Sequence, residues 1–389
     1  MTTHMDRTLL FFCFLFTLSL KSLTGQAQRL DKQQAAALAK AEYLKQAELQ
    51  KSKLQTDWKR KQVDYEAHQM KFEYKIFGEK PSDGRSLYIS MHGGGGTTAA
   101  VNDQQWKNQI SLYTPKEGVY LAPRAPTNNW NLWHEAHIDT LFGQLIKAAI
   151  LMEGVNPDKI YLMGYSAGGD GTFQMAPRMA DHWAAAAMMA GHPGDASALN
   201  LRNLPFAIYM GEKDAAYHRN ELAAEWGKKL DSLEQANPGS FKHDLHIFAG
   251  MPHWMGRKDT IAIPWLAAFR RDPLPKKVSW VQDDVHRRQF YWLGVPAGDI
   301  KTAAKAIVSV SGNDISIEYN DHPELLLYLN DQLLDLDKKI KVIFNGRTIF
   351  RGKVPRSRSL IAQTASSLDP GHIFSAGLRV LGKKVSVLK

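Results

Sequence analysis

Residues 159–171 read KIYLMGYSAGGDG, and this stretch decides the fold. The apolar run 159–163 predicts a short buried strand, and the residues after Gly168 predict a helix. Between them lies the pattern G-x-S-x-G, in which a sharp strand-to-helix turn lifts a serine hydroxyl off the end of a sheet. Glycines flank the serine because the two backbones pass too closely there for side chains. Ser166 is therefore a candidate nucleophile.

Strand and helix signals alternate on both sides of this turn. Strands are expected at 70–76, 87–91, 119–122, 183–190, 206–210 and 245–248, and helices at 138–149 and 220–233, the first capped by Gly154. The segment 263–269 closes the unit. Such alternation predicts an α/β fold, with a mostly parallel sheet and helices on both faces.

The chain changes character after the proline-containing segment 271–277, which is typical of a linker. Short strands follow, and Asn345-Gly346 between two apolar runs predicts a hairpin. We expect a small C-terminal β-rich domain over 275–389 that contributes no catalytic group. Its aromatic residues, such as Trp280, Tyr291 and Trp292, could form a core or contact a polymer.

The N-terminal region has the pattern of a secretory signal. Arg7 precedes an apolar run at 9–20, and Ala27 lies where a small residue is needed for cleavage. We expect a signal peptide over 1–27, a secreted or periplasmic protein and no stable membrane anchor; the alternative is an uncleaved anchor. Cys13 is the only cysteine and would leave with the signal, which excludes thiolate nucleophiles and thiolate metal sites.

The chain has 389 residues and a formal net charge of +10. A basic surface could attract anionic polysaccharide, lipid headgroups or nucleic acid. No nucleic-acid motif is present, so a solvated basic surface is the favoured interpretation. No metal-binding spacing is evident, and neither a metal nor a cofactor is expected.

A serine hydroxyl becomes a useful nucleophile when a base removes its proton. Asp214 follows the strand at 206–210, and His253 follows the strand at 245–248. Both therefore lie at the edge where parallel sheets place their sites, and their chain order is serine, acid, histidine. Asp214 could instead cap the helix that follows it, and Asp195 is then the main rival for the acid, with Glu212 a weaker one.

Backbone N–H groups are needed for the oxyanion of acyl transfer. Ala167, directly after the nucleophile, offers one. The run His92-Gly-Gly-Gly-Gly96 fits a loop that offers others, and Gly94 and Gly95 are favoured, with His92 organising the loop. Aromatic residues on nearby loops are expected to contact substrate. These are Trp130, Trp133, Tyr165 and Trp254.

With these motifs the chain resembles the α/β-hydrolase superfamily, and most of all its secreted esterase branch, which includes polyhydroxybutyrate depolymerase-like and feruloyl esterase-like enzymes. The resemblance covers about residues 68–272. It implies an α/β-hydrolase catalytic domain at 66–272. Residues 29–62 are rich in Ala, Gln, Lys and Leu, so a polar helical or disordered leader is expected at 28–65. The resemblance also implies a serine hydrolase that cleaves carboxylic esters, from a polysaccharide or another polymer among the candidates. The alternatives are a peptidase acting on short peptides and a catalytically silent binding protein. The oligomeric state stays open.

Overall fold

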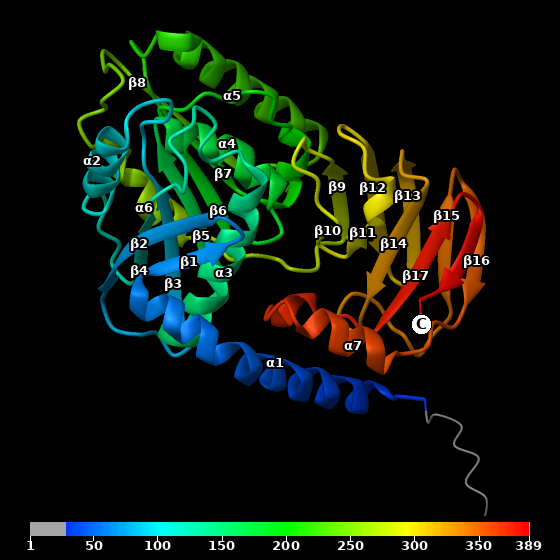
Figure 1. The fold of residues 1–389 in the computed structure, drawn as a ribbon. Coiled ribbons are helices and arrows are strands. Elements are labelled where there is room, and N and C mark those ends of the chain that lie inside the picture. Colours follow the sequence, from blue (N-terminus) through cyan, green and yellow to red (C-terminus); the bar gives the residue numbers. More distant parts are fainter. Residues whose placement is uncertain (1–28, 389) are drawn as a thin grey trace, which may run out of the picture.

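The computed structural model describes residues 29–388; the expected signal peptide at 1–27 lies outside them. Eight strands form the main sheet in the order β1-β2-β4-β3-β5-β6-β7-β8 (Figure 1). The strands β3 to β8 are parallel, and β1 and β2 pair antiparallel at one edge. Their bounds are β1 Gln62–Tyr65, β2 His68–Phe77, β3 Arg85–Met91, β4 Gly118–Pro123, β5 Val155–Tyr165, β6 Ala185–Met189, β7 Phe206–Gly211 and β8 His243–Phe248.

Helices cover both faces of this sheet, as the alternation predicts. Along β5, Ile160 and Leu162 join one apolar cluster with α3 and α4, whereas Tyr161 and Met163 join another with α6, since successive side chains point to opposite faces. Gly154 ends α3 with a φ of 66°. The helices are α2 Ala99–Gln109, α3 Ala136–Glu153, α4 Ala167–Arg178, α5 Arg219–Ala236 and α6 Ala262–Ala267. The chain therefore has the α/β-hydrolase fold.

The C-terminal part contains two five-stranded sheets, in the orders β10-β11-β14-β17-β18 and β16-β15-β13-β12-β9. The predicted hairpin at Asn345-Gly346 joins β15 to β16. The bounds are β9 Lys277–Val281, β10 Gln289–Phe290, β11 Leu293–Gly294, β12 Lys305–Ser311, β13 Asp314–Asn320, β14 Glu324–Leu329, β15 Ile340–Phe344, β16 Arg347–Gly352, α7 Arg358–Ala365, β17 Ala376–Leu381 and β18 Lys384–Val387. Five short 3₁₀ helices complete the elements: η1 Ala198–Asn203, η2 Ala216–His218, η3 Lys258–Ile261, η4 Ala297–Asp299 and η5 Pro370–His372.

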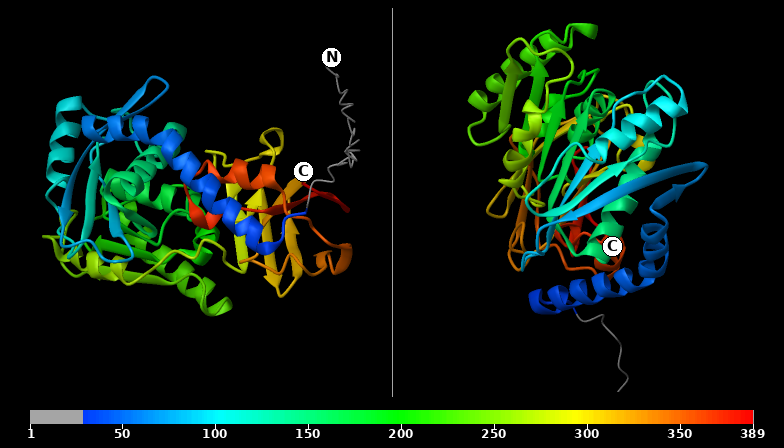
Figure 2. Two further views of the ribbon diagram at one scale, coloured as in Figure 1. Left: turned by 90° about the horizontal axis from the view of Figure 1, so that it is seen from below. Right: turned by 90° about the vertical axis from the view of Figure 1, so that its left-hand side faces the viewer.

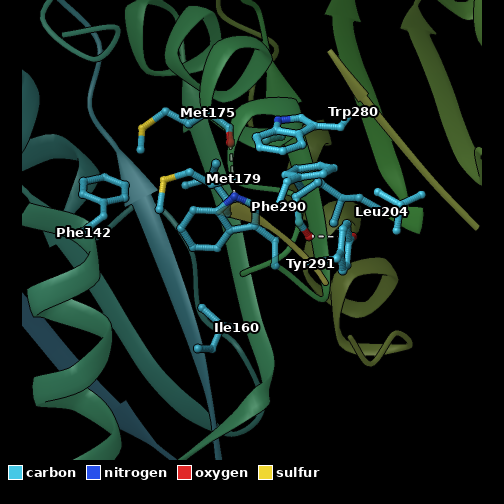
Figure 3. Packing of buried hydrophobic residues seen from close by; sticks show 14 of the residues in the cluster. Phe142, Ile160, Met175, Met179, Leu204, Trp280, Phe290 and Tyr291 are labelled. Atoms are coloured by element: carbon cyan, nitrogen blue, oxygen red, sulfur yellow. Dashed lines mark hydrogen bonds between the residues drawn. The ribbon is translucent and has the colours of Figure 1, made fainter. Parts of the chain in front are cut away.

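The two parts share one apolar core across the predicted linker. Trp280, Phe290 and Tyr291 of the C-terminal part belong to the same buried cluster as Met175 and Met179 of the hydrolase part (Figure 3). Trp280, Tyr291 and Trp292 are at most 1% exposed, so these three are core residues and are not available to a polymer. The prolines mark a boundary along the chain, but the packing continues through it.

A buried ion pair also joins the two parts. The guanidinium of Arg271 donates to both carboxylate oxygens of Asp369, at 2.6 and 2.8 Å, and to Asp158. Burial alone would raise the pKa of Asp369, but the charges of Arg271 and His372 hold it well below its usual range. The Arg271 side chain is only 3% exposed, so its charge depends on these partners.

Asp369→Asn is expected to lower the free energy of unfolding by about 3 to 5 kcal/mol, because the buried guanidinium of Arg271 loses one of its two carboxylate partners. Denaturant titration would measure this. Glu48→Gln is the matched control: its pair with Lys51 is exposed and should be worth at most about 1 kcal/mol. Equal, small effects of both substitutions would contradict the assigned role of the buried pair.

The segment predicted as a leader is mainly the long helix α1, Lys32–Arg60, which spans both parts of the molecule (Figure 2). Asp31 and Gln34 form a capping box at its start. Leu54 and Trp58 join the main core, and Ala35 packs with residues of the C-terminal part. The helix is therefore part of the fold, and the sheet already begins at Gln62. Among residues 29–388, no helix combines the length and apolar character needed to span a membrane.

Candidate active site

The predicted turn lies between β5 and α4. Ser166 has φ 58° and ψ −123°, a conformation that costs a non-glycine residue about 1–3 kcal/mol. A Cβ on Gly164 would lie 2.1 Å from the carbonyl oxygen of Gly168, and one on Gly168 would lie 2.2 Å from that of Met91. Both glycines are required by the close approach of backbones, as the sequence predicts.

The structure brings together the three residues predicted for the triad. The Ser166 hydroxyl lies 2.9 Å from His253 Nε2, and His253 Nδ1 lies 2.7 Å from Asp214 Oδ2. Because a carboxylate accepts, Nδ1 carries the proton and Nε2 is left to accept from the serine. Asp214 is 2% exposed and His253 41% exposed, so the acid is buried and the base faces the solvent.

The two rival acids have other partners. Asp195 Oδ1 accepts from the side-chain amide of Gln174 at 3.0 Å. Glu212 Oε2 accepts from the backbone N–H of Gly250 at 2.6 Å. Asp214 also receives a hydrogen bond from Arg219 at 3.3 Å. The geometry therefore favours Asp214 as the acid.

Asp170, in the first turn of α4, is a partly buried carboxyl that sequence reasoning did not single out. Burial raises its pKa to about 6, and the backbone N–H of His192 and the charges of Arg219 and His253 act in the opposite direction. Its Oδ1 accepts from that N–H at 2.6 Å and so fixes the loop after β6. Its position four residues after Ser166 is the only signal in the sequence.

The glycine run after β3 is organised by His92, as expected. The Nε2 of this buried histidine accepts the N–H of Ala125 at 3.1 Å, so Nδ1 is protonated and donates to the carbonyl of Gly93 at 2.6 Å. Burial lowers the pKa of His92 to about 4, which keeps it neutral near pH 7. His92 thus orients the loop and is not placed to exchange protons with Ser166.

The preference for Gly95 as an oxyanion donor is corrected. Its N–H donates to Asn102 Oδ1 at 2.9 Å and is already engaged. Gly93 and Gly94 line the pocket beside Ser166 instead. Within residues 29–388, no hydrogen bond engages the N–H of Gly94 or Ala167. These two remain the candidate donors.

A pocket of about 630 Å³ opens at Ser166 and His253. One wall is a single face of α2 and the turn after it: Gln105, Asn108, Gln109 and Leu112. Tyr165 and Trp254 form an aromatic wall. The lining contains no Asp, Glu, Lys or Arg side chain, so the pocket suits uncharged groups.

Of the four aromatic residues expected at the substrate, Tyr165 and Trp254 line the pocket, and Trp130 and Trp133 do not. Trp130 and Trp254 are 64% and 50% exposed. Trp133 is 1% exposed and donates its indole N–H to the carbonyl of His92, so the expectation that it contacts substrate is wrong. Trp130 and Trp133 lie only three residues apart, and the sequence does not show that one is exposed and the other buried.

Tyr165 lines the pocket, but its hydroxyl serves the protein. Burial raises its pKa, so the hydroxyl stays protonated. It donates to the carbonyl of His253 at 2.6 Å and accepts the N–H of Met255 at 3.1 Å. The residue before the nucleophile therefore holds the loop that carries the histidine.

Tyr165→Phe is expected to lower kcat about tenfold with little change in KM, since a buried and a partly buried backbone group lose their partner and the His253 loop loosens. Steady-state kinetics would measure the split. Tyr209→Phe is the matched control, because it removes another tyrosine hydroxyl, bonded to Asp244, on the same face of the sheet. Equal losses in both variants would show that Tyr165 acts only through stability.

Within the described residues, no group of three or more His, Cys, Asp or Glu side chains is placed to hold a metal ion. The geometry offers chemistry through a serine, an imidazole and a carboxylate, with backbone donors beside them.

No protein-family model and no curated protein sequence matches this chain. Among solved structures it is similar to a thermostable esterase (18% identity, TM-score 0.43), covering 54% of this chain and 62% of that one, less than two thirds of its length. A ferulic acid esterase (13%, 0.39) matches 53% of this chain and 96% of its own. An alpha-beta serine hydrolase homologue from Coxiella burnetii (12%, 0.36) matches 53% and 94%. The fold assignment rests on the strand order and the turn at Ser166.

Proposed function

We propose that this protein is a serine hydrolase that cleaves carboxylic esters through an acyl-enzyme on Ser166. The observation that carries the proposal is the hydrogen-bonded series from Ser166 through His253 to a buried Asp214. The strained backbone of Ser166 supports the proposal, because residues with strained φ and ψ angles are found mainly at active sites and binding sites.

In the proposed reaction, His253 Nε2 takes the proton of Ser166 as its Oγ attacks the ester carbonyl. Asp214, bonded to Nδ1–H, stabilises the imidazolium that forms. The N–H groups of Ala167 and Gly94 hold the oxyanion. The imidazolium then gives its proton to the leaving alcohol. Water, deprotonated by His253, releases the acid and restores the serine.

Two other functions use the same scaffold. A peptidase on short peptides would need a group that binds a peptide terminus, and the lining of the pocket offers no carboxylate and no Lys or Arg for that purpose. A silent binding protein would not need all three groups in hydrogen-bond register. An ester is therefore the favoured substrate.

The test compares p-nitrophenyl acetate with an aminoacyl p-nitroanilide. An esterase should show an initial burst of nitrophenol equal to the enzyme concentration, and mass spectrometry should place an acetyl group on the Ser166 peptide. Faster turnover of the anilide would favour the peptidase. If the intact protein shows no turnover of either substrate and no labelling of Ser166, a catalytically silent binding protein is favoured.

A further inference from the structure

A second cavity, here called the α6 cavity, lies on the face of the main sheet that α6 covers. Its volume is about 880 Å³, against about 630 Å³ for the pocket at Ser166. Ser86 of β3 and Lys159 of β5 line it, and both come well before the carboxyl ends of their strands. Ser166 instead follows the carboxyl end of β5. The α6 cavity therefore lies away from the catalytic edge of the sheet.

The α6 cavity stays open because α6 is too short to cover this face. Its six residues rise about 9 Å, whereas the 11 residues of β5 extend about 36 Å. Beyond the helix, the Tyr161 hydroxyl donates to the carbonyl of Phe269 at 2.9 Å, which fixes the wall after α6. A large cavity with apolar walls and a few charged groups is the usual form of a small-molecule site. Its apolar walls include Tyr88 and Tyr161 of the sheet and Ile263, Pro264 and Ala267 of α6.

Positive side chains border the α6 cavity, and two of them are free of carboxylates. Lys116 and Arg257 both belong to the lining, and both are exposed. Within residues 29–388, neither forms an ion pair. The guanidinium of Arg257 donates one hydrogen bond to the carbonyl of Leu112 at 2.9 Å, and its other N–H groups are left for a ligand.

The other charges of the lining are already balanced. Lys159 is 7% exposed and pairs with Asp83 at 3.3 Å and with Glu117 at 3.5 Å. Arg270 also pairs with Asp83. Glu117 is the one carboxylate among the described residues of the lining, and the Lys159 ammonium faces it. The two unpaired cations are therefore the charges that can meet a ligand.

We propose that the α6 cavity binds an apolar carboxylate, with its hydrocarbon body against α6 and its charged end at Lys116 and Arg257. The unpaired cations decide the sign of the ligand, and a guanidinium can offer a carboxylate two parallel N–H groups. A small hydrated anion such as phosphate would leave the apolar walls uncovered. This site goes beyond the proposed function, since it needs no ester and uses no residue of the triad.

Octanoate is a suitable probe, because it joins an eight-carbon body to a carboxylate. Isothermal titration calorimetry with the protein should show binding of octanoate and about tenfold weaker binding of octanamide, which is equal in length and uncharged. Arg257→Gln and Lys116→Gln should each weaken octanoate binding about three- to tenfold. Lys258→Gln is the matched control, since it removes the next cation along the same loop, outside the lining, and should change the affinity less than about twofold.

Ala267→Trp tests the apolar half of the site without changing a charge. Ala267 is exposed and lines the α6 cavity, so an indole at this position can occupy the space of the ligand and should weaken octanoate binding about tenfold. Denaturant titration of each variant shows that it is folded.

Three outcomes would overturn the proposal. The first is folded protein that does not bind octanoate, or that binds it as well after Ala267→Trp and Arg257→Gln, because the octanoate then lies elsewhere, such as at Ser166. The second is equal affinity for octanoate and octanamide, which would remove the carboxylate from the proposal. The third is an equal loss in Lys258→Gln, which would assign the effect to the net charge of the surface. Because no ester is present, the result does not depend on whether the protein hydrolyses esters.

Discussion

Ser166→Ala is expected to reduce ester turnover about a millionfold and to abolish covalent labelling by a fluorophosphonate. The substitution removes only the hydroxyl oxygen, which lies 2.9 Å from His253 Nε2 and is the only nucleophile so placed within the described residues. Binding and the oxyanion donors remain, so a small residual rate is expected. The strained φ of 58° is kept, because alanine has the same Cβ, and the free energy of unfolding should change little.

Ser232→Ala is a suitable control for this experiment. Ser232 lies on the exposed side of α5 and bonds only the carbonyl of Lys228 one turn earlier. Its loss should leave both turnover and labelling intact. If the Ser166 variant, shown to be folded by circular dichroism, still takes up the fluorophosphonate, another residue is the nucleophile and the proposed mechanism fails.

Most of the hydrolase part could be predicted because each element carries its own apolar period. The six parallel strands and α3, α4 and α5 lie close to their expected positions. Helix α2 was not predicted, since its sequence AAVNDQQWKNQ is polar on almost every side and only Asn102 and Gln109 are buried. Helix α1 stayed ambiguous for the same reason.

The relation between the two parts of the chain could not be read from local signals. Pro273 and Pro275 indicate a break in regular structure, and the chain is indeed irregular there. Whether the parts of the chain before and after these prolines pack together depends on apolar residues far from them, such as Met179 and Tyr291. The composition of the proline-containing segment does not indicate whether such distant residues pack together.

In the candidate site too, some residues could be predicted from the sequence and others could not. Ser166, Asp214 and His253 follow from a motif and from chain order, and the structure places them in contact. Gly95 was misassigned because the engagement of its N–H depends on where the side chain of Asn102 lies.

Asp214→Asn is expected to lower kcat about ten-thousandfold, the second largest effect of these substitutions. An asparagine in place of the carboxylate would offer an amide N–H toward His253 Nδ1. The ring would then favour the tautomer that carries its proton on Nε2, which cannot accept from Ser166. The imidazolium formed during the reaction would also lose its counter-charge. Single-turnover kinetics with p-nitrophenyl acetate would measure the loss of the acylation step.

Asp195→Asn is the decisive comparison, because Asp195 was the main rival for the acid. Its carboxylate accepts from Gln174 and makes no hydrogen bond to His253 in the described part of the chain, so kcat should change less than about threefold. Circular dichroism and denaturant titration of both variants separate loss of fold from loss of chemistry. Because Asp214 is buried, its replacement should also cost some stability, but a loss of stability alone leaves the rate of the folded fraction unchanged. The reverse ranking of the two variants in kcat would move the acid to the loop after β6 and would require His253 to turn away from Asp214 during the reaction.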